Sequence, residues 1–417
     1  MRIEKIIPGG QALATMPDGK KAFFWNALPD EIINDYKVTK NKSRYVEAIA
    51  TELTNLSPHR VEPKDACFLS TSPWQIIDYD YELKLKQSLV EEVFREHDIE
   101  IEEPEVITDG RDYHYRNKME YALYWDHDTE KIHLAFHERG SHRKIPINSS
   151  SLERPEIFEA ATKIVDDLNS RHEEARKYQS LLLRCNKKGE VSGGLYENHQ
   201  PHPVFPPLSD AILGHTYSYS PNGFFQINLP VYEMALQEIK QHIATDEVLD
   251  LYSGVGTIGL SVARDKKLTL VECDKSAYAE LCKNCGGNGD TAFSERSLAP
   301  VVTGLGRSVF GPSPNMLLEG DIPIPHAILA KSEDVISHIR PEQTVILDPP
   351  RSGCDRKLID KLNEVKPAKI IYLSCNPATQ ARDAKLLLEN YHIDIVKTYN
   401  FFPHTPHIEN LIVLSRR

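Results

Sequence analysis

A cysteine, a carboxylate and a guanidinium follow two apolar segments near the end of the chain. The run 370–373 leads to Cys375, and the run 344–347 leads to Asp348 and then Arg351. Short apolar runs of this kind predict buried parallel strands, and open α/β sheets bind their ligands at the carboxyl ends of such strands. The sequence therefore predicts one site that holds a nucleophile, a carboxylate and a positive charge.

A glycine-rich turn further upstream is typical of nucleotide-cofactor sites. Residues 250–256 read Asp-Leu-Tyr-Ser-Gly-Val-Gly and open a predicted helix, and Glu272 ends the next predicted strand. Such a turn lets the backbone approach a ligand, and the later carboxylate can hold ribose hydroxyls. Together with Asp250, the turn forms a D-x-x-x-G-x-G pattern, which favours S-adenosylmethionine over a dinucleotide.

A thiol beside a methyl donor has a defined chemical use. C5 of a pyrimidine is a weak nucleophile, but addition of sulfur to C6 pushes electron density onto C5, which can then take a methyl group. A base must afterwards remove the C5 proton. Three candidates precede the apolar run 411–414, namely His404, His407 and Glu409. The residue types alone leave the choice among these three open.

Length and composition limit the class of protein. The chain has 417 residues, which predicts two or three domains, and its net charge of −12 argues against non-specific coating of nucleic acid. No apolar run reaches membrane-spanning length and the start lacks a signal-peptide pattern, so we expect a soluble, cytoplasmic protein without a membrane partner. The seven cysteines are scattered, which predicts free thiols, and the lone Cys282–Cys285 pair does not predict a metal site.

Pattern changes along the chain predict three parts. Turn signals between short strand-like pieces suggest a small β-barrel over 1–62, and mixed patterns predict an α+β central domain over 63–205. After a proline-rich connector, 206–417 alternates strands and helices as in a Rossmann-like α/β domain. A helix is expected over about 81–98, and the segment of about 286–325 reads as a long insertion.

Five motifs in this order resemble the S-adenosylmethionine-dependent RNA 5-methyluridine methyltransferases. The resemblance is strong over the carboxyl-terminal half, and several ordered motifs are far more specific than one. They are Phe224-Phe225-Gln226-Ile227-Asn228, the turn from Asp250 to Thr257, Asp348-Pro349-Pro350-Arg351-Ser352-Gly353, Ser374-Cys375-Asn376-Pro377 and the segment from Phe402 to Glu409.

The resemblance implies roles for individual residues. Cys375 is expected to be the nucleophile and Glu409 the base that removes the C5 proton. Arg351 is a candidate electrostatic group, and Phe224 or Phe225 a candidate for stacking near the target base. The positions that match cofactor contacts in the family are Gln226, Tyr252, Glu272, Asp348 and Thr257, the last at a place where the family often has Asn.

The amino-terminal half resembles the same family more weakly. Its first part is similar to a TRAM barrel, an OB-like RNA-binding module, and Arg116 and Lys118 lie in a segment similar to the family's central-domain signature. Several relatives carry four cysteines for an iron–sulfur cluster just after the barrel. This chain has only Cys67 there, so we expect no cluster and a single buried thiol.

Together these patterns predict a monomer that methylates C5 of a uridine in structured RNA, either tRNA or rRNA. Because the atom lies inside a stacked base, the target must be single-stranded or flipped out. Two rival enzymes would methylate cytosine C5 or an exocyclic amine, and a third rival is an RNA-binding or RNA-folding protein. The amine reaction gives no function to Cys375 or Glu409.

Overall fold

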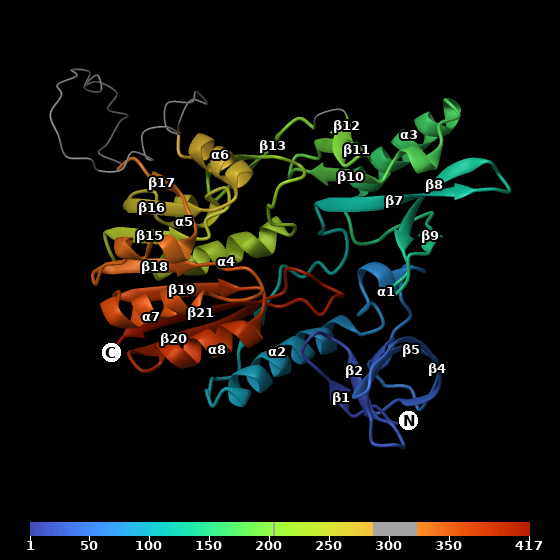
Figure 1. Ribbon diagram of the computed structural model, residues 1–417, viewed down its shortest axis with the longest axis horizontal. Helices are drawn as coiled ribbons and strands as arrows, with labels where there is room; N and C mark the ends of the chain where they lie inside the picture. Colours follow the sequence, from blue (N-terminus) through green and yellow to red (C-terminus); the bar gives the residue numbers. More distant parts are fainter. Residues whose placement is uncertain (203–204, 287–322) are drawn as a thin grey trace.

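The computed structural model describes residues 1–202, 205–286 and 323–417. Figure 1 shows three assemblies: a small barrel at the amino terminus, a middle sheet and a large sheet flanked by helices on both faces. Apart from its two ends, the insertion expected at about 286–325 lies outside the described residues. The architecture is the predicted Rossmann-like α/β domain with an OB-like barrel and an α+β part.

The large sheet has eight strands in the order β17-β16-β15-β18-β19-β21-β20-β6. The first five are parallel, and β21 lies antiparallel between β19 and β20. The strands are β15 (Glu247–Leu251), β16 (Lys267–Glu272), β17 (His326–Leu329), β18 (Gln343–Leu347), β19 (Lys369–Ser374), β20 (Tyr391–Tyr399), β21 (Glu409–Arg416) and β6 (Glu105–Ile107). The antiparallel position of β21 brings its first residue to the edge where β18 and β19 end.

Two apolar cores cover the faces of this sheet, because its central strands are apolar on both sides. One face packs on α4 (Leu229–Gln241), α5 (Thr257–Val262) and α6 (Lys275–Asn284). The other packs on α7 (Arg356–Val365) and α8 (Pro377–Leu387). Two short 3-10 turns follow β17, η2 (Ser332–Asp334) and η3 (Ile336–His338).

Helix α2 (Tyr79–Glu96) lies against α8 although it comes almost 300 residues earlier in the chain (Figure 1). Asp78 caps its start by accepting a hydrogen bond from the backbone N of Tyr81 at 2.9 Å. The helix buries Leu89, Val90, Val93 and Phe94 in the core of that face, each contributing about 1.5–3 kcal/mol of hydrophobic stabilisation. Strand β6 then continues the sheet beside β20.

The barrel has the strand order β1-β2-β3-β5-β4, with β3 and β5 parallel, and an Arg2–Ile32 bridge joins its two ends. Its strands are β1 (Lys5–Ile6), β2 (Ala12–Thr15), β3 (Lys21–Trp25), β4 (Ile32–Asn41) and β5 (Tyr45–Thr54). This closed order is that of an OB-like barrel, as predicted.

The middle sheet has the order β12-β11-β10-β7-β8-β9 and packs on α3 (Pro155–Ser170). Its strands are β7 (Lys118–Asp126), β8 (Lys131–His137), β9 (Lys144–Pro146), β10 (Ser180–Cys185), β11 (Val191–Glu197) and β12 (Gln200–His202). The remaining elements are α1 (Phe68–Thr71), η1 (Ala175–Lys177) and the hairpin of β13 (Leu208–Ile212) and β14 (His215–Tyr219).

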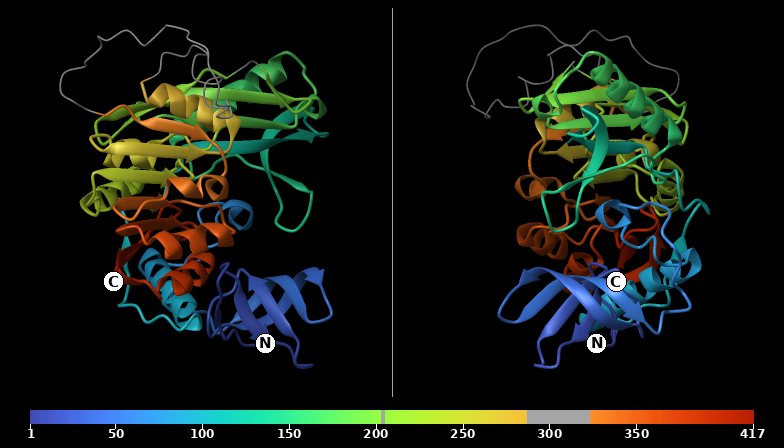
Figure 2. Two further views of the ribbon diagram at one scale, coloured as in Figure 1. Left: turned by 60° about the vertical axis from the view of Figure 1, so that its left-hand side comes forward. Right: turned by 90° about the vertical axis from the view of Figure 1, so that its right-hand side faces the viewer.

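The turn between β8 and β9 extends toward the barrel (Figure 2), and its side chains contact it. Glu138 Oε1 lies 3.3 Å from Lys37 Nζ, and the Arg139 guanidinium lies 4.2 Å from the centre of the Trp25 ring. The barrel and the middle sheet are therefore in contact with each other as well as with the large sheet.

Candidate active site

A cavity of about 990 Å³ opens at the carboxyl edge of the large sheet. Its volume is at the upper end of the range of small-molecule sites. It is bordered by the ends of β15, β16, β18 and β19, the start of β21, and the turn before α4. The predicted site residues among its walls are Arg116, Phe224, Gln226, Tyr252, Thr257, Glu272, Asp348, Arg351, Cys375 and Glu409.

Cys375 and Glu409 meet at this edge because of strand register. Ser374, the last residue of β19, pairs with Asn410, the second residue of β21. Cys375 follows Ser374 and Glu409 precedes Asn410, so the antiparallel register brings both residues to the same edge of the sheet, and both line the cavity. Asn376 then caps α8 by accepting a hydrogen bond from the backbone N of Ala378 at 3.2 Å, and Pro377 begins the helix.

The electrostatics of this edge raise the pKa of each of its acidic groups. Burial raises the pKa of the Cys375 thiol to about 11, and the carboxylates of Glu409 and Asp348 add to this shift, while Arg351 opposes it. Burial, followed by repulsion from Asp348, raises the pKa of Glu409 well above its ordinary value. Burial also raises the pKa of Asp348 to about 7. Such shifts of grouped ionisable residues in a cavity are typical of active sites.

Arg351 is held between the two strand ends. Its backbone oxygen accepts hydrogen bonds from Asn376 Nδ2 at 2.8 Å and from Thr379 Oγ1 at 3.2 Å. Its Nη2 lies 3.3 Å from His407 Nδ1. The turn after β18 is thus tied to the start of α8, and the guanidinium reaches the side of the cavity that carries His407.

The glycine-rich turn after β15 lines the cavity and packs tightly against the protein on its other side. Gly256 has φ +88°, and a Cβ there would lie 2.6 Å from Leu281 Cδ1, so only glycine fits. Glu272 holds the turn, since its Oε2 accepts a hydrogen bond from the backbone N of Gly254 at 2.8 Å. Asp250 is fully buried and accepts from the backbone N of Gly259 at 2.9 Å, so it braces the turn from below.

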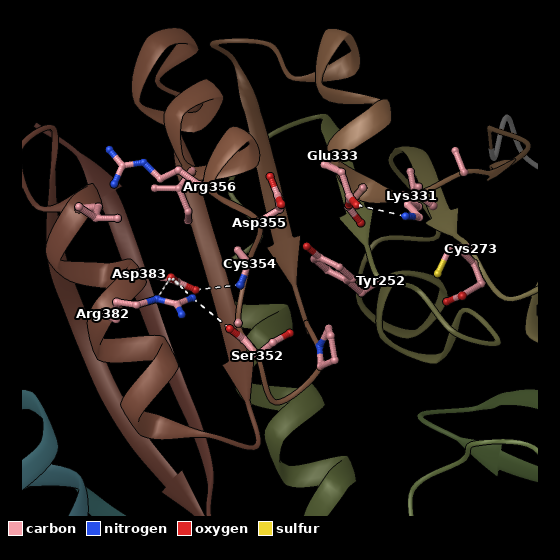
Figure 3. A pocket seen from close by; sticks show the side chains of 18 of the residues that line it. Tyr252, Cys273, Lys331, Glu333, Ser352, Cys354, Asp355, Arg356, Arg382 and Asp383 are labelled. Atoms are coloured by element: carbon pink, nitrogen blue, oxygen red, sulfur yellow. Dashed lines mark hydrogen bonds and ion pairs between the residues drawn. The ribbon is translucent and has the colours of Figure 1, made fainter.

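A second hollow of about 870 Å³ adjoins the first and shares Tyr252, Glu272, Cys273 and Pro350 with it. Figure 3 shows Tyr252 pointing into this hollow, with Cys354 and Asp383 on one side and Cys273 on the other. Its wall near Glu272 consists of Lys331, Ser332 and Glu333, which follow β17. These three residues belong to none of the sequence motifs described above, so the sequence alone does not identify them as part of a site.

At the mouth of the cavity, the members of two pairs of candidate RNA-binding residues, Phe224 with Phe225 and Arg116 with Lys118, have different surroundings. Phe224 is 75% exposed at the cavity wall, whereas Phe225 is buried and stacks on Tyr219 with ring centres 3.9 Å apart. Arg116 lines the cavity. Lys118 lies outside it: its Nζ donates hydrogen bonds to the carbonyl oxygens of Asn222 and Gly223 at 3.2 and 3.3 Å, which holds the turn that carries Phe224.

The two histidine candidates for the base are also separated. His407 lines the cavity, and burial, followed by repulsion from Arg351, lowers its pKa to about 4. His404 is buried at a distance from the cavity, where its Nε2 lies 3.3 Å from Asp112 Oδ2. The segment 402–409 thus directs His407 and Glu409 into the cavity and His404 away from it.

All seven cysteines lie in the described residues and carry free thiols, with Cys67 buried under the middle sheet. Among residues 1–202, 205–286 and 323–417, no group of three or more His, Cys, Asp or Glu side chains is arranged to hold a metal ion. In the same part of the chain, every helix is too short or too polar to cross a lipid bilayer.

Comparison with known proteins gives consistent matches. The model of the tRNA (uracil-5-)-methyltransferase family matches residues 336–417. An uncharacterized RNA methyltransferase of Lactobacillus johnsonii is 28% identical, covering 96% of this chain and 94% of the relative, and one of Lactiplantibacillus plantarum is 27% identical over 96% and 93%. The crystal structure of the Pyrococcus abyssi tRNA (uracil-54, C5)-methyltransferase with S-adenosyl-L-homocysteine superposes with a TM-score of 0.70 at 22% identity, covering 99% of both chains.

The sheet order, the cavity at its carboxyl edge and the superposition show a Rossmann-like methyltransferase fold. The family model matches the carboxyl-terminal part of the chain, and the relatives that match over nearly its full length are RNA methyltransferases, so the chain is similar to the RNA 5-methyluridine methyltransferase family.

Proposed function

We propose that the protein methylates C5 of a uridine in tRNA or rRNA through a covalent bond between Cys375 and C6 of the base. The observation that carries the proposal is the meeting of Cys375 and Glu409 at one cavity edge. The cytosine and amine alternatives are not favoured by any feature of the cavity. The amine reaction also has no step that needs both a thiol and a buried carboxyl group.

In the first step, the Cys375 thiolate adds to C6 of uracil, and the C5–C6 double-bond electrons move toward C5 and O4. S-adenosylmethionine, when bound, would supply the methyl group: its transfer to C5 would break the methyl–sulfur bond and leave S-adenosylhomocysteine. In the last step, Glu409 takes the proton from C5, the C5–C6 double bond re-forms, and the sulfur–C6 bond breaks. Arg351 favours the thiolate because its positive charge lowers the pKa of Cys375.

The residues around the glycine-rich turn fit a methyl donor with an adenosine group. Each oxygen of the Glu272 carboxylate accepts one backbone hydrogen bond, from Gly254 and from Asp274, and keeps a second lone pair for a ribose hydroxyl. The second hollow beside Glu272 offers space for adenine next to Cys273 and Ser332. The proposed donor-binding residues are Gln226, Tyr252, Thr257, Glu272 and Asp348.

The mouth of the cavity suits a nucleotide that is turned out of the RNA. An exposed ring such as Phe224 can stack on a base, and Arg116 can neutralise a phosphate. Lys118 would act by holding the turn under Phe224, in view of its bonds to Asn222 and Gly223. We infer that the barrel supplies further backbone contacts to the RNA.

The site of methylation tests this proposal directly. The protein is incubated with S-adenosylmethionine and unmodified tRNA or rRNA transcripts labelled with tritium at uridine C5, and nucleosides are then analysed by mass spectrometry. We expect 5-methyluridine and an equal release of tritium. Formation of 5-methylcytidine or of an amino-methylated nucleoside, without tritium release, would contradict the proposal.

Donor binding should depend on pH through Asp348. Its pKa is about 7, so the carboxyl group gains a negative charge as the pH rises through neutrality. The sulfonium is a cation, so its affinity should increase by up to about tenfold from pH 6 to pH 8. Calorimetry should show this increase for S-adenosylmethionine and a smaller one for S-adenosylhomocysteine, whose sulfur is uncharged. In Asp348→Asn the affinity should not increase with pH. A pH-independent affinity in the unaltered protein would contradict this role.

Replacing Arg351 should raise the pKa of Cys375. Arg351→Gln removes the positive charge that lowers this pKa, so less thiolate is present at any pH below it. Iodoacetamide should alkylate Cys375 about three- to tenfold more slowly at pH 8, because one pKa unit changes the thiolate fraction about tenfold. Peptide mass spectrometry measures this rate. Arg351→Lys keeps the charge and is the control; faster alkylation of Arg351→Gln would refute the assignment.

A further inference from the structure

The loop of residues 400–408, which joins β20 to Glu409 at the start of β21, lies against three parts of the molecule. Trp74, after α1, donates its backbone N–H to His404 O at 3.0 Å. Tyr115 donates its hydroxyl to Pro403 O at 3.0 Å. Gly10 of the barrel lies so close to Pro406 that a Cβ there would be 2.1 Å from Pro406 Cβ. The position of this loop is thus determined by residues outside the catalytic sheet.

The strongest attachment of the loop is a buried ion pair on α2. Lys86 Nζ lies 2.9 Å from Glu82 Oε1, and both side chains have no exposed surface. Lys86 Nζ also donates to Asn400 Oδ1 at 2.6 Å and to Phe402 O at 3.1 Å. Glu82 Oε2 accepts the backbone N–H of His404 at 2.9 Å. One ion pair therefore bonds to the loop at three points.

A contribution to the stability of the folded protein does not explain why the Glu82–Lys86 ion pair is buried. Two buried charges lose their hydration, and replacing such a pair by apolar side chains of similar volume is often neutral or stabilising. Apolar side chains, however, would not fix the loop through directed hydrogen bonds. The bonds of Glu82 and Lys86 end on Asn400, Phe402 and His404, which immediately precede the two cavity residues His407 and Glu409.

We propose that Glu82 and Lys86 are positioning residues for the removal of the C5 proton. By fixing the 400–408 loop, they keep the Glu409 carboxyl group beside Cys375. The inference rests on the proposed role of Glu409. It assigns to a helix that lies more than 300 residues earlier in the chain a part in the last step of the reaction, and none in the attack by the thiol.

The test compares how the covalent protein–RNA adduct forms and decays. The variant Glu82→Leu/Lys86→Met replaces the ion pair by apolar side chains of similar size. In single-turnover reactions with ordinary uridine RNA, we expect adduct decay to slow by about tenfold to a hundredfold, as displacement of a catalytic group by about 1 Å can do. The rate of adduct formation should change much less. Denaturing gels of quenched samples measure both rates.

A matched control is available in the barrel. Glu31 and Arg60 form a comparable ion pair in which Glu31 is buried and Arg60 partly buried, with Arg60 Nε 2.6 Å from Glu31 Oε1, and Glu31 also accepts a backbone N–H from Leu28. The variant Glu31→Leu/Arg60→Met should lose stability without slower adduct decay. If the α2 double variant does not fold, Asn400→Ala removes the loop acceptor of Lys86 and should also slow decay.

The outcomes separate this inference from the proposed function. If Glu409→Gln accumulates adduct but neither the α2 double variant nor Asn400→Ala does, the positioning role is wrong and the function stands. Equal slowing in the barrel control would also overturn the positioning role, since a general loss of stability would explain it. If Glu409→Gln itself accumulates no adduct, the proposed function fails first.

Discussion

The variant Cys375→Ser should lose covalent attachment to RNA and almost all methylation. A serine hydroxyl is far less acidic than a thiol, so it cannot supply the nucleophile in a cavity where burial already raises the pKa of Cys375 to about 11. Loss of a nucleophile lowers turnover by about 10⁴-fold or more. RNA that contains 5-fluorouridine provides the sharpest measurement, because fluorine cannot leave as a proton and the adduct is trapped.

Two other cysteines serve as controls for this experiment. Cys273 lines the same cavity and is exposed, and Cys354 is buried beside the second hollow. Cys273→Ser and Cys354→Ser should both form the trapped adduct, and peptide mass spectrometry should map it to Cys375. An adduct on Cys354, or none with an RNA that the enzyme does methylate, would refute the mechanism.

The variant Glu409→Gln should stop the reaction after methyl transfer. The glutamine side chain keeps the shape of glutamate but cannot accept the C5 proton, so the sulfur–C6 bond cannot break. We expect turnover to fall by about 10²- to 10⁴-fold, the usual contribution of a general base. Adduct should then accumulate with ordinary uridine, carrying the transferred methyl group, which radiolabelled S-adenosylmethionine would reveal on a denaturing gel.

Two cavity residues provide the comparison for Glu409. Glu280 also lines the cavity, on the donor side, and His407 lies beside Arg351. Glu280→Gln should resolve its adduct at a normal rate. If His407→Gln accumulates methylated adduct and Glu409→Gln does not, the histidine is the base, although its pKa of about 4 makes it a weak one.

The fold class could be predicted because short apolar runs and turn residues show where strands end. The carboxyl ends of β18 and β19 carry Asp348 and Cys375 as the apolar runs indicated. The meeting of Glu409 with Cys375 could not be derived from spacing alone. It depends on β21 entering the sheet antiparallel between β19 and β20, and only the family resemblance singled out Glu409 beforehand.

Other parts of the site depend on tertiary contacts that no local pattern reports. Phe224 and Phe225 are the same residue type, but only the stacking on Tyr219 shows which one is buried. His404 and His407 differ in the same way, since α2 and Asp112 surround the former. Lys86 resembles a surface lysine of an amphipathic helix, and the partner that buries it, Asn400, lies 314 residues away.

Strand β6 has a consequence for how the chain assembles. It forms the edge of the large sheet beside β20, yet a ribosome makes it long before that neighbour exists. Helix α2 likewise cannot pack against α8 until α8 has been synthesised. A fragment that starts after the middle sheet would expose the backbone of β20 and the apolar face of α8, which favours aggregation. The catalytic sheet can therefore be completed only after β20 and β21 have been synthesised, and pairing between such distant segments makes folding slow.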